Sequence, residues 1–585
     1  MRRLTSERSD FIEDAIAHNS WWENDRGGLE RVAEYPFRSD LSRFIEKVAR
    51  WRQEDVERAV TSVAGQTGIG KTTMFLQAIA AMIEGEPNLQ REFSASRETL
   101  RQFIGSVPPT QILYLPLDAS MYRLETPEHA LDELENVVDY FRSHVAKSTR
   151  PEYVFLDDIG AIETNDVKER LLDIVGENTY LFVAGGTKSL VDFGTWPEER
   201  GIYYDADFDP VGMLPLKFVD FVKMQAEEAD EEGLESRIKE YQSSSIGERE
   251  PYIKEIRQGF ETNDFESLLT AIDAFYWDEL DVADREDLHD YAKEYIVKGG
   301  LLSQPDFGIP QDLDKIPELT TGTRQAIDEI VNDLIKARLH VEIHEEIAPH
   351  HSIERSERLY KLCSFGAKKS PPEYKFTELA EMIGVDRRTV GSYLDALEDA
   401  LVLKQSKDFS LQKHRETRLY LRDTRHVILL SQLKDHEGFE SFRDTYNGTI
   451  SPNQTFERSL ALTAGFDHAV RLSFVIRRGY PKEDRERVEY YVTDDGPVDF
   501  VIHDHGTVYP FILDYQPLTG YASNVAESFD PSVGSHDEAV SYEAPVRFVV
   551  TDDRRPHDGD GSLVTELSAN KTLCRLPFWL YLLIC

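Results

Sequence analysis

The sequence is short of cysteine, of positive charge and of long hydrophobic runs. Its 585 residues include three cysteines, Cys363, Cys574 and Cys585, and its 66 lysines and arginines are outnumbered by 108 aspartates and glutamates. An odd cysteine count spread over a long chain excludes a disulfide scaffold, and no cysteine pair has metal-ligand spacing with the histidines. The net charge of −42 disfavours a general nucleic-acid binder, because phosphate binding needs a basic face.

Neither end of the chain predicts a membrane segment. The start has an arginine pair with no apolar run behind it, which is not the pattern of a secretory or twin-arginine signal. The last ten residues, LPFWLYLLIC, are strongly apolar, but a transmembrane helix needs about 20. We interpret them as a buried terminal strand. We therefore expect a cytoplasmic protein that does not associate with membranes.

The composition is that of a multidomain globular protein with an unusual charge. At about 150 residues per domain, the length predicts three or four domains. Hydrophobic residues make up 40% of the chain, enough for each domain to bury a core. Acidic residues are spread along the whole sequence, a composition that halophiles use to stay soluble in salt. Our hypothesis is a halophilic source, and a melting temperature that does not rise with KCl would contradict it.

Apolar, β-branched runs alternate with helical segments between residues 31 and 215. These runs cover residues 60–64, 112–117, 153–156 and 180–184. Strands separated by helices indicate a parallel sheet with crossover connections. A short amphipathic helix is expected before this region, over residues 10–22. The fold class that we predict for the first large domain is therefore α/β.

The most specific motif follows the first of these runs. It matches G-x-x-x-x-G-K-[ST] and consists of Gly65, Gln66, Thr67, Gly68, Ile69, Gly70, Lys71 and Thr72, followed by Thr73. The glycines let backbone N–H groups surround phosphate oxygens, and the N-terminus of the next helix adds partial positive charge. In such a loop Lys71 reaches the β and γ phosphates of ATP, and the Thr72 hydroxyl ligates Mg²⁺. This P-loop predicts nucleotide binding.

Two later strand ends supply candidates for metal binding and catalysis. The strand at residues 153–156 runs into Asp157, which we expect to order the Mg²⁺ shell, and Asp158, which we expect to position the attacking water. Asp158 is one methylene shorter than a glutamate, and small misplacements in catalytic geometry cost large rate factors. Thr187 follows the strand at 180–184 and is the candidate sensor of the γ phosphate. The alternative is that Thr187 belongs to a glycine turn into the next helix.

Taken in order, these motifs resemble those of prokaryotic AAA-type P-loop ATPases that carry a winged helix and a C-terminal nuclease-like domain of unknown function. The likeness also rests on residues 214–218 (LPLKF) and on the glycine pair Gly299-Gly300. It extends from about residue 35 to the end and is most specific in the ATPase part. Family members have glutamate where this chain has Asp158, and Thr-Gly-Ser where it has residues 184–186 (AGG). Both departures imply a slow ATPase or a nucleotide-dependent switch.

The resemblance and the composition together predict five regions. They are an N-terminal helix (1–34), a P-loop ATPase core (35–215), an acidic helical lid (216–345), a winged-helix-like domain (346–410) and a C-terminal α+β, restriction-endonuclease-like domain (411–585). In the fourth region, a helix that opens with Arg387, Arg388 and Thr389 has the place of a recognition helix. Acidic residues surround it, so DNA contact and a connector or dimerisation role both stay open.

The last region lacks part of the pattern that a metal-dependent nuclease needs. Such a site has an acid on one strand and, on the next, an acid and a lysine two residues apart, which hold a metal and activate water. Asp499 matches the first acid, but the other two positions hold Ile512 and Asp514. We therefore expect an inactive domain that serves as a scaffold or binds a protein partner.

Three functions are compatible with these observations. The leading one is a Mg²⁺-dependent ATPase of the AAA type, whose nucleotide state moves the helical, winged-helix and C-terminal domains. The second is a DNA-binding regulator that uses ATP as a conformational ligand. The third is a non-catalytic defence or assembly component whose C-terminal domain docks a partner. The resemblance also allows an oligomer, by fold-level analogy alone.

Overall fold

The computed structural model describes most of the chain in two compact units. The described residues are 10–33, 38–84, 103–117, 126–147, 149–162, 166–206, 209–228, 251–280, 282–301, 335–367, 371–410, 416–431, 454–515, 521–534, 542–552, 562–568 and 571–584. The first unit comprises Met1–Leu214, Arg338–Ser356 and Asp399–Leu401, and the second comprises Pro215–Ala337, Glu357–Glu398 and Val402–Cys585. Among the described helices, none has the length and apolar character needed to cross a membrane.

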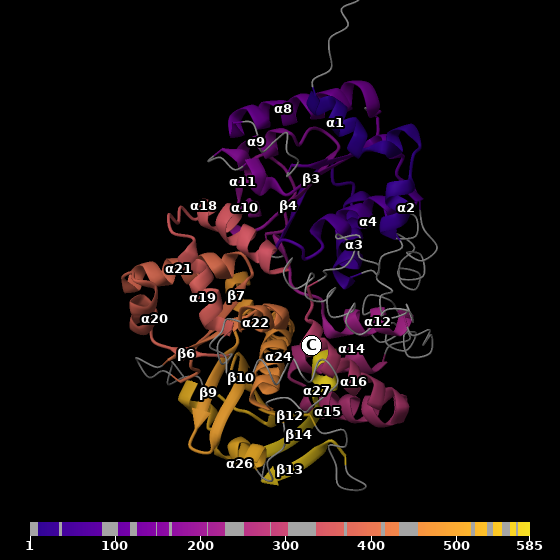
Figure 1. Ribbon diagram of the computed structural model, residues 1–585. Helices are drawn as coiled ribbons and strands as arrows, with labels where there is room; N and C mark the ends of the chain where they lie inside the picture. The colour runs from indigo at the N-terminus through magenta and orange to yellow at the C-terminus, as the bar shows by residue number, and fades with distance from the viewer. Residues whose placement is uncertain are drawn as a thin grey trace, which may run out of the picture. The chain divides into compact units, whose positions relative to one another are not determined.

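The described part of the first unit contains a five-stranded parallel sheet in the order β2-β3-β4-β1-β5 (Figure 1). Its strands are β1 (Arg58–Gly65), β2 (Ile112–Pro116), β3 (Glu152–Asp157), β4 (Thr179–Gly185) and β5 (Val211–Met213). The predicted parallel α/β sheet is confirmed. Because the strands pair in parallel and in register, the carboxyl ends of β1, β3 and β4 lie along one edge.

Helices cover both faces of this sheet. They are α1 (Asp10–His18), α2 (Gly27–Ala33), α3 (Ser39–Gln53), α4 (Lys71–Glu84), α8 (Pro127–Tyr140), α9 (Val167–Asp173), α10 (Lys188–Val191) and α11 (Trp196–Glu199). On β3, Val154 packs in the core that α1, α8 and α9 share, whereas Phe155 contacts Phe75 of α4 edge to face and stacks with Phe182 of β4. Burial on both faces explains why these strands are continuous apolar runs and do not alternate with polar residues.

The second unit contains a six-stranded mixed sheet in the order β13-β14-β12-β11-β10-β9. The strands are β9 (Glu489–Thr493), β10 (Gly496–Asp504), β11 (Thr507–Asp514), β12 (Val546–Thr551), β13 (Val564–Ser568) and β14 (Lys571–Pro577). The described helices are α12 (Phe218–Glu228), α14 (Pro251–Thr262), α15 (Phe265–Ala274), α16 (Val282–Lys298), α22 (Thr424–Ser431), α24 (Gln454–Ile476), α25 (Lys482–Arg485), α26 (Tyr521–Ser528) and α27 (Phe578–Ile584). Phe500 and Phe511 pack against Tyr581 of α27, while Ile512 packs in the core beside α26.

A smaller region of the second unit holds the predicted helix-turn-helix. It consists of α19 (Glu357–Ala367), α20 (Phe376–Ile383), α21 (Arg387–Asp399) and a three-stranded antiparallel sheet of β6 (Glu373–Tyr374), β7 (Leu403–Ser406) and β8 (Thr417–Leu421). Gly384 ends α20 with φ +68°, a left-handed conformation that glycine adopts without strain. Helix, glycine turn, helix and hairpin follow one another here, and the winged-helix assignment itself stays a prediction.

The structure differs from the sequence-based expectations at the C-terminus. The apolar C-terminus is not a terminal strand: β14 ends at Pro577, and Phe578–Ile584 forms the buried helix α27. An apolar run buried on all sides fits a helix as well as a strand, so periodicity cannot separate them. Arg338–Ser356 belongs to the first unit, and the five predicted regions with their boundaries stay a prediction.

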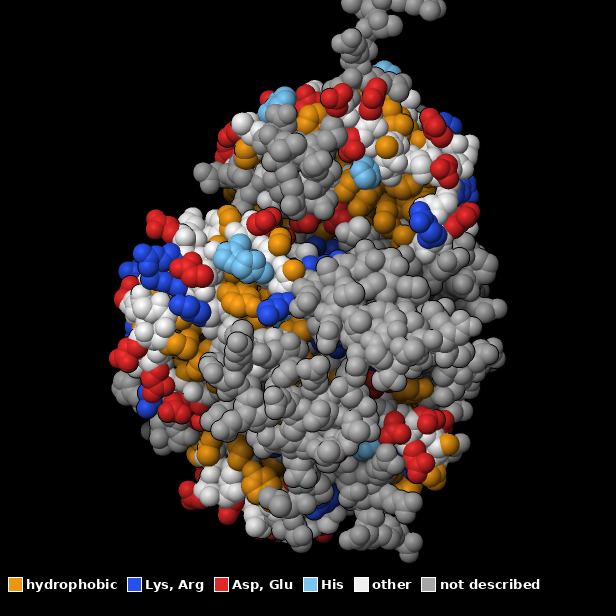
Figure 2. Space-filling view, in the orientation of Figure 1, with side chains coloured by type: hydrophobic (Ala, Val, Ile, Leu, Met, Phe, Trp, Pro, Cys, Tyr) orange, Lys and Arg blue, Asp and Glu red, His pale blue; other side chains and the backbone are white. Residues whose placement is uncertain are grey.

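Charge is distributed over the surface as the composition suggests. Figure 2 shows acidic side chains scattered over the visible face of the described residues, with no single acidic patch. This distribution agrees with the even spread of aspartate and glutamate along the sequence.

Candidate nucleotide-binding site

The P-loop joins the end of β1 to the start of α4 at the carboxyl edge of the parallel sheet. Gly68 and Gly70 have φ values of +81° and +102°, which side chains with a Cβ rarely adopt. Gly65 is enclosed, since a Cβ there would lie 3.1 Å from both the Cβ and the carbonyl oxygen of Met213. Backbone conformation at Gly68 and Gly70, and lack of space at Gly65, therefore explain why the motif has glycine at these positions, as in a phosphate-binding loop.

Lys71 is buried beneath this loop. Its Nζ donates to the carbonyl oxygens of Gly65 (2.7 Å) and Gln66 (3.2 Å). Ile69 is fully buried, and Thr73 is half-buried in the first turn of α4. The ammonium group thus lies among loop carbonyls, from which it could extend to a phosphate.

Thr72 and Asp157 are brought together as the motifs predict. The Thr72 hydroxyl donates to Asp157 Oδ2 at 2.6 Å, and the Tyr114 hydroxyl donates to the same oxygen at 3.0 Å. The other oxygen, Oδ1, is buried and has no hydrogen-bond partner among the described residues. Burial raises the pKa of Asp157 to about 6, with the neighbouring Asp158 carboxylate adding to the effect. A buried carboxylate oxygen without a donor, next to a threonine hydroxyl, fits a Mg²⁺ ligand set.

The two candidate catalytic residues, Asp158 and Thr187, differ in backbone conformation and in hydrogen bonding. Asp158 follows β3 with φ +59°, a left-handed conformation that costs an aspartate about 1–2 kcal/mol. Thr187 is almost fully buried and caps α10, its hydroxyl accepting from the Leu190 N–H at 3.3 Å. Thr187 therefore has a structural role at the start of a helix, and its role as a sensor stays a prediction.

A segment distant in sequence contributes two carboxyl groups to the P-loop. The π-helical turn η8 (Glu342–Ile347) carries Glu342 and Glu346, and Glu346 Oε1 accepts from the Thr67 hydroxyl at 3.0 Å. Glu342 is 2% exposed and accepts a hydrogen bond from the Thr67 backbone N–H. Burial, and next the Glu346 carboxylate, raise the pKa of Glu342 well above its usual value, while Lys71 opposes the shift. Glu342 thus occupies hydrogen-bonding capacity that a phosphate would use.

Three residues outside the motif, Arg38, Arg338 and Leu401, support the loop, and the sequence motifs do not reveal them. Arg38 is buried and donates to the carbonyl oxygens of Ile69 (2.7 Å) and Leu214 (2.6 Å). The Gln66 side chain donates to the Leu401 carbonyl at 2.5 Å. The guanidinium of Arg338 lies so close to Gly68 that a Cβ there would be 2.5 Å from Nη1. Arg38, Arg338 and Leu401 belong to no local motif, so only the fold could bring them to the loop.

Two elements that carry the family resemblance contact one another within the second unit. Leu216 N donates to the Gly300 carbonyl at 2.8 Å, and the Tyr295 hydroxyl donates to the Leu216 carbonyl at 2.7 Å. A Cβ on Gly300 would lie 2.6 Å from Leu216 N. Close backbone approach therefore explains the glycine, and Lys217, the residue after Leu216, is buried.

The candidate residues of the other domains are also placed. Asp499 is buried on β10, where its Oδ2 accepts from the Leu513 N–H at 2.8 Å. Ile512 lies in the apolar core beside α26, and Asp514 ends β11. Arg387 and Arg388 are exposed at the start of α21, whereas the Thr389 hydroxyl donates to Asp386 at 2.7 Å. The scaffold role and the DNA contact stay predictions.

Comparisons with known proteins add little to this geometry. A family model described as "Domain of unknown function (DUF8612)" matches residues 321–437, a stretch that includes η8 and the helix-turn-helix. No curated protein matches the chain. Among solved structures, the Aeropyrum pernix ORC1 protein in complex with DNA aligns with 68% of this chain and 93% of its own, at 11% identity and a TM-score of 0.27. At that score the likeness carries no argument for fold or function.

Proposed function

We propose that this protein is a Mg²⁺-dependent, ATP-binding ATPase of the AAA type with slow turnover. The observation that carries the proposal is the contact between Thr72 and Asp157 beside a complete P-loop, with Asp157 Oδ1 left without a donor. If this turn had only a structural role, burying a carboxylate oxygen without a hydrogen-bond donor would destabilise the fold by roughly 1–3 kcal/mol, and nothing would compensate for it. A cation held by Thr72 and Asp157 removes that cost.

The residues of the proposed site have separate roles in binding ATP and Mg²⁺. On nucleotide binding, Lys71 exchanges the carbonyl oxygens of Gly65 and Gln66 for the β and γ phosphates. Backbone N–H groups of residues 66–72 and the N-terminus of α4 surround the phosphate oxygens. Mg²⁺ neutralises charge on the phosphates when bound. Asp158, next to Asp157 at the end of β3, is the residue that orients water.

Glu342 gives the nucleotide a way to affect the rest of the chain. Phosphate and the Glu342 carboxyl group compete for the Thr67 N–H, and a carboxylate beside phosphates is repelled. ATP binding must therefore displace η8 or keep Glu342 protonated. Because η8 and α18 (Ala348–His350) continue along the chain into α19 of the second unit, displacement of this segment is the proposed link between nucleotide state and the other domains.

The direct test is equilibrium binding of a fluorescent ATP analogue with Mg²⁺. Lys71→Ala should weaken binding by at least about 100-fold, roughly 2.7 kcal/mol, because the cation for two phosphates is lost. Lys147→Ala, which removes an exposed lysine of the same unit, is the matched control and should bind as wild type. Glu342→Ala should bind more tightly than wild type. Equal binding by Lys71→Ala and Lys147→Ala, with both proteins folded, would overturn the assignment.

A DNA-binding role is the second candidate, and one observation favours it. Arg387 and Arg388 are exposed in the first turn of the second helix of a helix-turn-helix, where base edges and phosphates are contacted. Fluorescence anisotropy with duplex DNA at two salt concentrations tests it. Arg388→Ala should weaken binding and reduce the salt dependence by about one phosphate contact, while exposed Arg355→Ala should change neither. Wild-type protein that binds no duplex at low salt excludes this role.

A further inference from the structure

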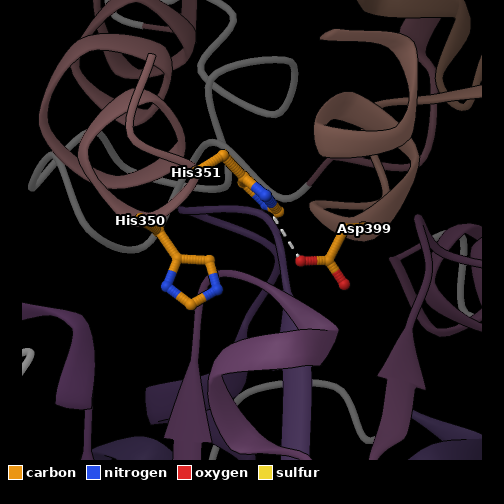
Figure 3. Close-up of side chains that lie close together, drawn as sticks. All are labelled: His350, His351 and Asp399. Atoms are coloured by element: carbon orange, nitrogen blue, oxygen red, sulfur yellow. Dashed lines mark hydrogen bonds and ion pairs between the residues drawn. The ribbon is translucent and has the colours of Figure 1, made fainter. Parts of the chain in front are cut away.

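Two histidines and an aspartate from distant parts of the sequence converge in the first unit. His350 ends α18, His351 follows it, and Asp399 is the last residue of α21. One nitrogen from each histidine and one carboxylate oxygen lie within 4.8 Å of one another. Figure 3 shows the two rings and the carboxylate turned toward one another. No second group of three such side chains is found in the part of the chain that the structure describes.

The contacts around Asp399 hold its carboxylate in place. His351 Nε2 lies 3.1 Å from Asp399 Oδ2, and the Ser189 backbone N–H donates to Oδ1 at 2.8 Å. The Ser189 hydroxyl lies 2.7 Å from His350 Nε2 and also contacts Asp399. A carboxylate oriented from outside by a backbone N–H is the arrangement that fixes a metal ligand. The three candidate ligands are neither deeply buried nor fully exposed, which leaves access for an ion.

A simple ion pair does not account for this arrangement. Asp399 already accepts from the Ser189 backbone N–H and pairs with His351, and the neighbouring His350 is turned to the same place, where its Nε2 lies 2.7 Å from the Ser189 hydroxyl. The centroids of the two imidazole rings lie 4.8 Å apart, with their planes at 83°. Side chains of consecutive residues usually diverge, so their convergence on one carboxylate is the observation that needs an explanation.

We propose that His350, His351 and Asp399 form a binding site for Zn²⁺. Imidazole nitrogens with one carboxylate suit zinc, whereas Ca²⁺ and Mg²⁺ require sets of oxygen ligands. Tetrahedral zinc with bonds of about 2.0–2.1 Å places its ligands roughly 3.3–3.5 Å apart. The distance of 3.1 Å between His351 Nε2 and Asp399 Oδ2 is close to this value. Rotation of the His350 ring would bring its nitrogen to a similar distance from the other two ligand atoms. Water, or the Ser189 hydroxyl, completes the shell.

The position of the site suggests what the ion does. The ligands come from two separate segments of the first unit, Arg338–Ser356 and Asp399–Leu401, and Ser189 of α10 contacts His350 and Asp399. The same segment, Arg338–Ser356, carries Glu342 and Glu346 to the P-loop, and Leu401, two residues after Asp399, accepts from Gln66. Zinc therefore fastens the segment that contacts the P-loop. The site goes beyond the proposed nucleotide function and does not depend on it.

The test is metal binding by the full chain, produced without a histidine tag and measured without nucleotide. Co²⁺ should bind one equivalent with the visible absorption of a tetrahedral site, and Zn²⁺ should displace it. His350→Ala and His351→Gln should each weaken Zn²⁺ binding by more than about 100-fold, beyond the 10–100-fold loss typical of outer-shell changes. His351→Gln keeps an amide next to Asp399, so the fold should be retained.

The matched control is a second pair of histidines on the same segment. The rings of His340 and His344, four residues apart, have centroids 4.0 Å from each other and planes tilted at 54°. Figure 2 shows histidines exposed near the place where Figure 1 labels α18. Zn²⁺ bound by exposed histidines is therefore the alternative that this control must exclude. His340→Ala should bind Zn²⁺ as wild type. The proposal is overturned if wild type binds no Zn²⁺, or if folded His350→Ala and His351→Gln bind Zn²⁺ as tightly as wild type, whatever the behaviour of His340→Ala.

Discussion

Asp157 and Asp467 are both 2% exposed, yet their surroundings are opposite. In the first unit, Asp157 receives hydroxyl donors on one oxygen only, and burial raises its pKa to about 6. In the second unit, Asp467 on α24 accepts from Arg422 at 2.8 Å and from Arg471 at 2.9 Å. Burial would raise its pKa too, but these two arginines outweigh it and lower the pKa.

The difference separates a binding site from a scaffold. A buried carboxylate with both oxygens paired to arginines is complete and has nothing left to offer a ligand. A buried carboxylate with one oxygen unpaired costs stability until something binds it, and such costs persist where function requires them. Burial alone therefore does not single out a functional aspartate, and the unpaired oxygen is the observation on which the proposed Mg²⁺ role of Asp157 rests.

The largest effect is expected from substitution of Asp467, the aspartate that is paired with two arginines. Asp467→Asn removes the only charge that Asp467 offers Arg422 and Arg471, and should lower the free energy of unfolding by about 3–5 kcal/mol. Urea unfolding at neutral pH measures it, with exposed Asp494→Asn as the control. Because the folded pKa is lowered, this stabilisation is present above the usual aspartate pKa and is lost as the pH falls below it. A loss under 1 kcal/mol would contradict the pairing.

The unpaired member should respond in the opposite way. Asp157→Asn should weaken binding of Mg²⁺ with ATP by about 30-fold, roughly 2 kcal/mol, without lowering the free energy of unfolding. The raised pKa means that this group stabilises the fold fully below about pH 4 and less as the pH rises through about 6, so the amide relieves a cost at neutral pH.

The same aspartate predicts a pH dependence of metal binding. Ligation of Mg²⁺ requires ionised Asp157, so wild-type affinity should rise as the pH increases through about 6 and then level off. Asp157→Asn should keep only the smaller rise that comes from ionisation of the γ phosphate of ATP. Isothermal titration of Mg²⁺ into the ATP complex between pH 5 and pH 8 distinguishes the two, and parallel curves for both proteins would show that Asp157 is not the ligand.

The sequence was sufficient for the features that depend on neighbours along the chain. The P-loop, the apolar strands and the glycine that ends α20 are local patterns with local physical causes, and β1, β3, β4 and α4 formed where these patterns predict. Parallel pairing then places Asp157 next to Thr72, because the carboxyl ends of β1 and β3 share an edge.

Features made by distant segments could not be predicted in this way. Glu342 lies 275 positions after Thr67, in a stretch that reads as an acidic helix, and nothing in its local pattern separates it from a solvent-exposed glutamate. His350 and His351 stand out only once Asp399 is placed beside them. The terminal helix α27 shows the other limit, since a run buried all round has no periodicity that separates helix from strand.

The smallest expected effect tests the residue next to Asp157. Asp158 has φ +59°, which glycine adopts without strain and alanine does not. Asp158→Gly should therefore have a free energy of unfolding about 1 kcal/mol higher than Asp158→Ala, as measured in urea. Both variants lose the carboxylate, so both should lose ATP turnover while they still bind ATP. Glycine would be more stable than aspartate at this left-handed position, so we infer that the aspartate is kept for its carboxylate. Turnover at the wild-type rate in Asp158→Gly would contradict this inference.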